Sequence, residues 1–385
     1  MKKICCGLLV ILIAGCKEKY QLPFTTPDTG YLVVEGVIDI GPNSTIIELS
    51  RTNKLSSTKK LSEKGATVKV EGDDNSSFNL TEISTGRYAA TLNLQSLKKY
   101  RLRIKTLTGK EYLSDFEAVK VTPPIDSIGW QAENNGVQLY INTHDPQNKT
   151  IYYQWDYQET WEFHSAFRSV LKFVTKPGPF GTLVADIAYK DPVTHGTDTT
   201  ILTCWRSAAS NQIIIGSSVK LSQDIIYKPF IFIPSDDRRI SVLYSIQLKQ
   251  HALTKPAYEF LEKMKKNTEE NGSIFDPQPS QLQGNIHCIT DVNEPVVGYV
   301  SISSVEEKRL FIDHTQVPFW HYRTPCEEDI VKNNTDSITE SWRSGSVPTT
   351  GLVFIGSFIS YFGTTTHDCI DCTLSGTNVK PAFWP

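Results

Sequence analysis

The feature that most constrains the fold is a series of short strand patterns between residues 31 and 121. Apolar or alternating segments recur there, and each is bounded by the Gly, Asp, Asn or Ser residues that favour turns. The segments cover residues 31–38, 44–50, 66–71, 77–82, 86–92, 100–105 and 111–116. Six or seven short strands spaced by turns are typical of a β-sandwich. The sequence therefore predicts an N-terminal β-sandwich domain over residues 31–121.

The order of motifs in this domain carries a resemblance. Gly-Ala-Thr-Val-Lys-Val begins at Gly65, Gly-Arg-Tyr at Gly86, and a Tyr-x-Leu-x-Ile pattern at Tyr100. This order resembles small immunoglobulin- or transthyretin-like modules. The paired prolines Pro123 and Pro124 stiffen the chain and cannot lie inside a central strand, so they predict a domain boundary. A larger β-rich domain is expected over residues 125–385, which makes the whole chain mainly β.

Within the second domain, residues 153–163 alternate between apolar and polar side chains. One face holds Tyr153, Trp155, Tyr157, Glu159, Trp161 and Phe163. This face has two interpretations, an aromatic platform for a ligand or the core face of a strand. The core face is favoured, because alternation with period two is what any half-buried strand requires.

One or two short helices are expected in this domain, and only one has a clear pattern. Lys255 and Pro256 open it, Thr254 is its candidate N-cap, and Tyr258, Leu261 and Met264 follow at helical spacing. We expect a surface helix laid across a sheet.

The N-terminus has the pattern of a bacterial export signal. Lys2 and Lys3 precede an apolar run over residues 4–14, which is about half the length of a membrane-spanning helix. The run ends in Ile13-Ala14-Gly15-Cys16, which resembles the bacterial lipobox. The resemblance implies a signal peptide over residues 1–15 and lipidation of Cys16 with several acyl chains, which makes attachment effectively permanent. The alternative is an ordinary secretory signal with a chance cysteine. Residues 16–30 then form a flexible tether.

The residues after Cys16 indicate a location. Lys17-Glu18-Lys19 lacks the Asp that retains proteobacterial lipoproteins in the inner membrane, and it partly resembles the charged surface-export signal of Bacteroidetes. The resemblance implies a lipid-anchored protein of the outer membrane, exposed at the cell surface. The choice between periplasmic and surface leaflet stays open.

Cysteine usage also fits an oxidising compartment. The chain has eight cysteines, of which Cys5 and Cys6 lie in the expected signal peptide and Cys16 is the expected lipidation site. The five others are Cys204, Cys288, Cys326, Cys369 and Cys372. An odd number predicts two disulfides and one free thiol. We expect Cys369 or Cys372 to pair with Cys326 or Cys288. A zinc site of four thiolates is the weaker alternative, because only one Cys-x-x-Cys half of such a site is present.

Other chemistry is sparse in the sequence. A net charge of −3 without a basic stripe argues against nucleic-acid binding. The sequence holds no recognisable catalytic motif, so no enzyme, metal or cofactor is predicted. Three Asp-Ser/Thr-small-or-apolar sequences match the O-glycosylation sequon of Bacteroidetes, with acceptors at Ser127, Thr199 and Ser337.

Several segments together resemble one family. They include Cys204-Trp205, Ala257-Tyr258-Glu259-Phe260, Gly284-Asn285-Ile286, Val297-Gly298-Tyr299 and the closing Cys-x-x-Cys with Lys-Pro-x-Phe-Trp. The chain resembles the Bacteroidetes lipoproteins catalogued as domain of unknown function 4249, typically encoded beside TonB-dependent receptors. The resemblance implies an accessory or binding partner of such a receptor in nutrient capture or uptake. The alternative is a structural or adhesive envelope lipoprotein without a small-molecule ligand.

Overall fold

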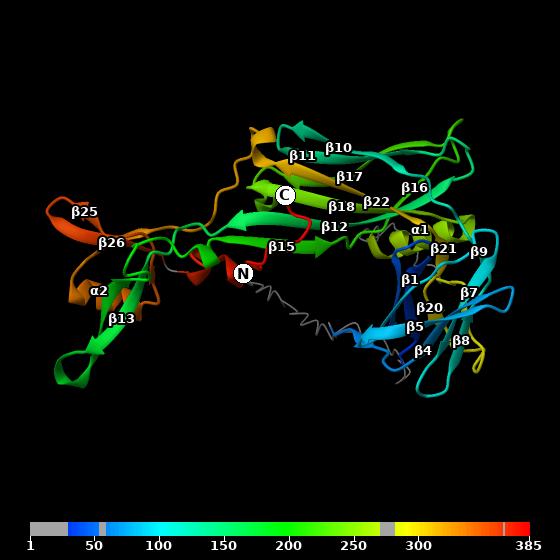
Figure 1. The fold of residues 1–385 in the computed structure, drawn as a ribbon, viewed down its shortest axis with the longest axis horizontal. Coiled ribbons are helices and arrows are strands. Elements are labelled where there is room, and N and C mark those ends of the chain that lie inside the picture. The colour runs from blue at the N-terminus through cyan, green and yellow to red at the C-terminus, as the bar shows by residue number, and fades with distance from the viewer. Residues whose placement is uncertain (1–29, 54–58, 270–281, 365) are drawn as a thin grey trace, which may run out of the picture.

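The computed structural model describes residues 30–53, 59–269, 282–364 and 366–385. The predicted signal peptide (1–15), the predicted lipidation site Cys16 and nearly all of the predicted tether lie outside these described residues. The described chain is mainly β with two α-helices, which confirms the predicted fold class. It forms three lobes arranged along one long axis (Figure 1). None of the helices in the described part has the length and apolar character needed to cross a bilayer.

The N-terminal lobe is a β-sandwich built mainly from the first ninety residues of the predicted mature fold. Its strands are β1 (Leu32–Asp39), β2 (Ser44–Arg51), β3 (Leu61–Ser62), β4 (Thr67–Gly72), β5 (Ser77–Ser84), β6 (Arg87–Thr91), β7 (Lys99–Lys105), β8 (Glu111–Ser114) and β9 (Glu117–Ala118). The alternating residues of these strands point into one core, which includes Ile47, Val70 and Tyr88, all 0% exposed. Alternation therefore identified the buried face correctly, since successive strand residues point to opposite sides.

Three more strands of this lobe come from the range expected for the second domain. They are β19 (Ile286–Cys288), β20 (Val296–Val297) and β21 (Ser301–Ser303). β19 pairs with β8, and both β20 and β21 run parallel to β1. The predicted division assigns residues 286–303 to the second domain (125–385). In the structure these residues instead pair with strands of the first domain (31–121). The physical reason is the exposed edge of β1, whose unpaired backbone groups need hydrogen-bond partners.

The middle lobe packs two sheets against each other. One contains β10 (Ile125–Glu133), β11 (Gly136–His144) and β17 (Ile225–Pro234). The other contains β12 (Tyr152–His164), β15 (Thr203–Ala209), β16 (Ile214–Ser217), β18 (Leu243–Ala252) and β22 (Val305–Asp313). Tyr153 and Trp155 of β12 are 0% and 1% exposed and lie in the shared core. The aromatic face of residues 153–163 is therefore a core face.

The distal lobe lies at the opposite end of the molecule from the N-terminal lobe (Figure 1). It contains β13 (Leu171–Pro177), β14 (Leu183–Tyr189), β23 (Asp329–Lys332), α2 (Thr335–Arg343), β24 (Val347–Pro348), β25 (Val353–Ile355) and β26 (Phe358–Thr364). Its small core joins Leu171, Ala185, Ile338 and Tyr361. The sequence did not locate the hairpin β13–β14 or α2, although α1 and α2 together agree with the one or two helices expected in the second domain.

Six short 3-10 helices complete the described elements. They are η1 (Pro179–Gly181), η2 (Thr199–Ile201), η3 (Arg238–Ile240), η4 (His314–Gln316), η5 (His367–Cys369) and η6 (Cys372–Leu374). Asp237, Asp313 and Asp371 each cap one of them by accepting a backbone N–H.

Helix α1 (Lys255–Glu269) lies at the junction of the N-terminal and middle lobes (Figure 1). The backbone N–H of Ala257 donates to Thr254 Oγ1 at 3.4 Å, in agreement with the predicted N-cap. Tyr258 packs on Tyr152 of the middle lobe, and Phe260 packs on Tyr299 beside the N-terminal lobe. The helix therefore contacts both lobes rather than one sheet alone.

Candidate functional site

A cavity of about 440 Å³ lies where α1, the N-terminal lobe and the middle lobe meet. We call it the interlobe pocket. Its walls come from β1 and the turn after it, from β12, β18 and β22, from α1, and from residues 297–301. A volume of this size lies in the range of small-molecule sites, which often form between domains.

One wall of the interlobe pocket carries two basic side chains, each beside an acidic one. His251 Nε2 lies 2.9 Å from Asp156 Oδ2, and Lys249 Nζ lies 3.0 Å from Glu307 Oε1. Both basic side chains of this wall therefore already have acidic partners. His251 is only 5% exposed, so its ring is buried within the wall of the pocket.

Asp39, the last residue of β1, is the buried acid of the pocket. It is 2% exposed, its Oδ1 accepts the backbone N–H of Gly41 at 2.8 Å, and its Oδ2 has no hydrogen-bond partner. Burial raises the pKa of Asp39; the Gly41 amide, Asn43 and His251 oppose this effect, and Glu307 adds to it. An unpaired oxygen atom on a buried carboxylate is unusual, because buried polar groups are normally hydrogen-bonded.

The opposite wall is apolar. α1 contributes Ala257, Phe260, Leu261 and Met264, which share one helix face, and Val297 lies beside them. Methionine and leucine side chains adapt to ligands of different shapes. An apolar wall facing a few polar groups is the usual composition of a small-molecule site. The interlobe pocket can therefore hold a small organic molecule with one apolar and one polar side.

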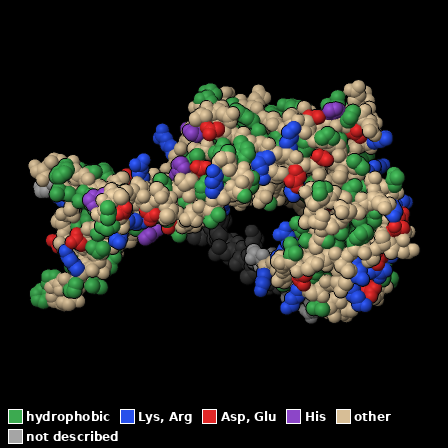
Figure 2. Space-filling model, viewed as in Figure 1, with side chains coloured by type: hydrophobic (Ala, Val, Ile, Leu, Met, Phe, Trp, Pro, Cys, Tyr) green, Lys and Arg blue, Asp and Glu red, His purple; other side chains and the backbone are tan. Residues whose placement is uncertain are grey.

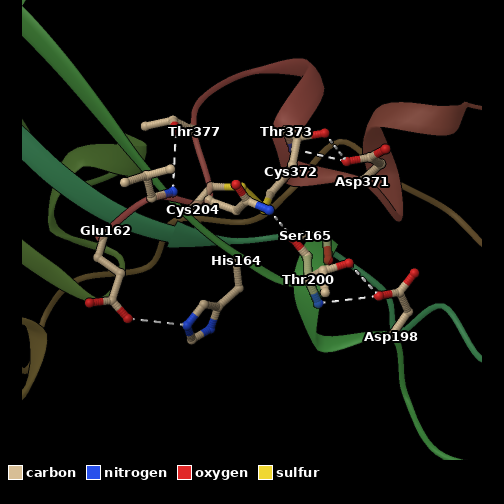
Figure 3. Close-up of a disulfide and its surroundings, with 12 residues drawn as sticks. Glu162, His164, Ser165, Asp198, Thr200, Cys204, Asp371, Cys372, Thr373 and Thr377 are labelled. Carbon is tan, nitrogen blue, oxygen red and sulfur yellow. Dashed lines mark hydrogen bonds and ion pairs between the residues drawn. A yellow bond between two sulfur atoms is a disulfide. The ribbon is translucent and has the colours of Figure 1, made fainter. Parts of the chain in front are cut away.

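The predicted disulfide candidates separate into two bonds and one free thiol. Cys326 bonds to Cys369 with a Cα–Cα distance of 5.8 Å, which confirms one predicted pairing. Cys372 bonds instead to Cys204 of β15, at a Cα–Cα distance of 5.7 Å (Figure 3). Cys204 was not among the expected partners, because its position beside η6 depends on the folded middle lobe.

Cys288 is the free thiol, and its inclusion among the disulfide candidates was wrong. It lies buried on β19 in the N-terminal lobe, whereas the other four cysteines lie in the middle lobe and toward the distal lobe. Its sulfur contacts Thr290 and Glu294 instead. Within the described residues, no group of three or more His, Cys, Asp or Glu side chains could hold a metal ion.

The three predicted O-glycosylation acceptors lie apart from one another and from the interlobe pocket. Thr199 is exposed in η2, Ser337 is half-buried in the first turn of α2, and Ser127 is half-buried in β10. Modification of these residues stays a prediction.

Sequence reasoning missed the interlobe pocket. Asp39 and His251 belong to strands that are far apart in the sequence, so no local motif unites them. The sequence does hold one signal for Asp39. A charged residue follows the mainly apolar segment from Leu32 to Ile38, and strand alternation alone does not explain a charge at that position. For His251 we find no such signal.

The fold and the pocket define a multi-lobed β-sandwich protein with a cavity between two of its lobes. Lys, Arg, Asp and Glu side chains are interspersed over the face in Figure 2. The chain belongs to the family described as Domain of unknown function (DUF4249), whose model matches residues 17–309.

Comparison with curated proteins and solved structures adds little. No curated protein matches the chain. A crystal structure described as "a putative carbohydrate binding protein from Bacteroides uniformis" is 12% identical, covering 58% of this chain and 90% of that one, with a TM-score of 0.15. Chitinase ChiA74 from Bacillus thuringiensis is 13% identical, covering 49% and 29%, also with a TM-score of 0.15. These TM-scores are too low to support an argument.

Proposed function

We propose that this protein is a lipid-anchored binding protein of the outer membrane, exposed at the cell surface, that assists a TonB-dependent receptor in nutrient capture or uptake. The observation that carries the proposal is the sequence Ile13-Ala14-Gly15-Cys16 after a charged and apolar start. Lipid attached to Cys16 would hold the mature chain at a membrane outside the cytoplasm.

The two disulfides support an extracytoplasmic location. Bonds such as Cys204–Cys372 and Cys326–Cys369 form and persist in oxidising compartments and are rare in the cytosol. The interlobe pocket supports a binding role, because its lining joins apolar side chains to a buried acid with one unpaired oxygen.

The first prediction tests the anchor and the partner together. The tagged wild-type lipoprotein, recovered from detergent-solubilised outer membrane, should bring down a TonB-dependent receptor barrel. Cys16→Ala should lose membrane retention and this co-recovery, because the acyl chains are missing. Cys6→Ala, a change inside the signal, should retain both.

Mass spectrometry of the recovered proteins measures the outcome. Recovery of only abundant porins would contradict the partnership. Growth of a deletion strain on defined nutrients separates the proposal from its alternative. A nutrient-specific defect supports uptake, while a defect in attachment or envelope integrity supports a structural or adhesive role.

A further inference from the structure

Two buried polar atoms in the interlobe pocket have no hydrogen-bond partner. They are Oδ2 of Asp39 and Nδ1 of His251, on residues that are 2% and 5% exposed. Both residues line the cavity. Leaving buried polar atoms unpaired costs free energy, so such atoms need an explanation, and a missing ligand is one.

Both unpaired atoms are hydrogen-bond acceptors. Nε2 of His251 lies 2.9 Å from a carboxylate oxygen of Asp156. An ionised carboxylate can only accept, so Nε2 carries a proton, and Nδ1 is an acceptor in the tautomer that this hydrogen bond fixes. Asp39 uses Oδ1 for the Gly41 amide, which leaves Oδ2 as a second acceptor. The walls of the pocket thus contain two buried acceptors that lack N–H or O–H donors.

The charges near these atoms favour a cation. Asp39, Asp156 and Glu307 line the pocket, while Lys249 is already paired with Glu307 at 3.0 Å. An anionic ligand would lie against the unpaired Asp39 carboxylate and would be repelled. A metal ion has no suitable set of three ligands among the described residues. An organic ammonium group supplies both the positive charge and the donors.

We propose that the interlobe pocket binds a small organic amine. Its ammonium group would donate to Asp39 Oδ2 and His251 Nδ1, and its apolar body would pack against Phe260, Leu261 and Met264 of α1. This inference rests on the proposed binding function and gives that function a ligand class. Charge-assisted hydrogen bonds of this kind are about twice as strong as neutral ones and give a site its orientation.

Isothermal titration of the full-length chain in detergent tests the ligand class. The probes are 2-phenylethylamine, the neutral 2-phenylethanol and the anionic 3-phenylpropionate, which share one apolar body. The amine should bind at least about 10-fold more tightly than the alcohol, since a hydrogen bond to a charged group is worth about that ratio. The carboxylate should bind more weakly still. Equal affinity for amine and alcohol, or tighter binding of the carboxylate, would overturn the proposal.

Matched variants locate the site. Asp39→Asn should weaken amine binding by roughly 10-fold or more, because the amide removes the charge but keeps the shape. Asp115→Asn is the control, an exposed acid of the same lobe outside the pocket. Unchanged amine binding in Asp39→Asn would contradict the assignment.

A second pair of variants does not touch the acids. Leu261→Trp should fill the pocket and abolish binding of the amine and the alcohol alike. Lys263→Trp, on an exposed position of the same helix, should leave binding unchanged. Retained binding in Leu261→Trp would overturn the proposal. Receptor co-recovery without amine binding would refute the ligand class alone, whereas amine binding without co-recovery would refute the receptor partnership alone.

Discussion

At the scale of the residue, Asp145 is held ionised by the turn that follows β11. It is 9% exposed and accepts backbone N–H groups from Gln147, Lys149 and Thr150 at 2.8–2.9 Å. Burial alone would raise the pKa of Asp145, but these three donors outweigh burial and lower it. The folded state therefore binds fewer protons at this residue than the unfolded chain does.

Asp145→Asn should lower the free energy of unfolding by roughly 1.5–3 kcal/mol at pH 7, because an amide nitrogen would face backbone donors. The contribution of Asp145 is complete above its unfolded pKa of about 3.9 and is lost as the pH falls through the lowered folded pKa. The difference between wild type and variant should therefore shrink below about pH 4. Urea unfolding followed by tryptophan fluorescence measures it.

Asp191→Asn is the matched control, because Asp191 accepts similar backbone hydrogen bonds in an exposed turn where water competes. Asp191→Asn should therefore lower the free energy of unfolding by less than Asp145→Asn does. A difference for Asp145→Asn that persists undiminished at pH 3 would contradict this account.

At the scale of the element, the C-terminal segment is held to the middle lobe by covalent and aromatic contacts. Cys372 of η6 is bonded to Cys204 of β15, and the backbone of Thr377 bonds to that of Trp205 (Figure 3). Further along, the Trp384 indole N–H donates to Glu162 Oε2 at 2.9 Å. The guanidinium carbon of Arg309 lies 3.6 Å from the centre of the Phe383 ring. The closing aromatic motif therefore packs on the sheet.

The double variant Cys204→Ser/Cys372→Ser should lose about 2–5 kcal/mol of stability, because the disulfide closes a long loop and restricts the unfolded chain. Residues after 372 should become sensitive to limited proteolysis, since terminal segments order only when attached. Cys288→Ala is the control, as it removes the free thiol and no disulfide. Equal protease resistance of wild type and double variant would show that the aromatic contacts hold the C-terminal segment in place without the disulfide.

At the scale of the whole molecule, two of the chain segments that connect the N-terminal and middle lobes bond to each other. Thr122 donates its hydroxyl to the Ser304 carbonyl, and its backbone N–H bonds to Ser304 Oγ at 2.8 Å. The Thr122 hydroxyl also accepts the backbone N–H of Ala252 at 3.0 Å. The predicted linker at Pro123 and Pro124 is thus fixed, through Thr122, to the end of β18 and to the residue before β22.

Thr122→Val keeps the shape of the side chain and removes these hydroxyl bonds. We expect a wider distribution of lobe separations in small-angle X-ray scattering, together with a loss of roughly 1–3 kcal/mol for the buried groups left unpaired. Thr175→Val, at an exposed position of β13, should change neither quantity. Identical scattering curves for wild type and Thr122→Val would show that other contacts fix the lobes.

Predictions from the sequence succeeded where the deciding physics is local. The face of β12 that carries Trp155 is buried as expected, because strand alternation depends only on neighbouring residues. The start of α1 after Thr254 follows from capping, which also acts within one turn. The hairpin β13–β14 escaped notice because most of its residues are exposed or half-exposed, so its apolar alternation is weak.

The sequence by itself determined the β character of this protein, the buried faces of its main strands and the number of its disulfides. Only the tertiary structure decided that residues 286–303 return to pair with β1 and β8, and that Cys372 meets Cys204. It alone brought Asp39 and His251 to one pocket. The reason is that periodicity indicates which side of a strand is buried. The strand with which it pairs depends instead on hydrogen bonds and packing between segments far apart in the chain.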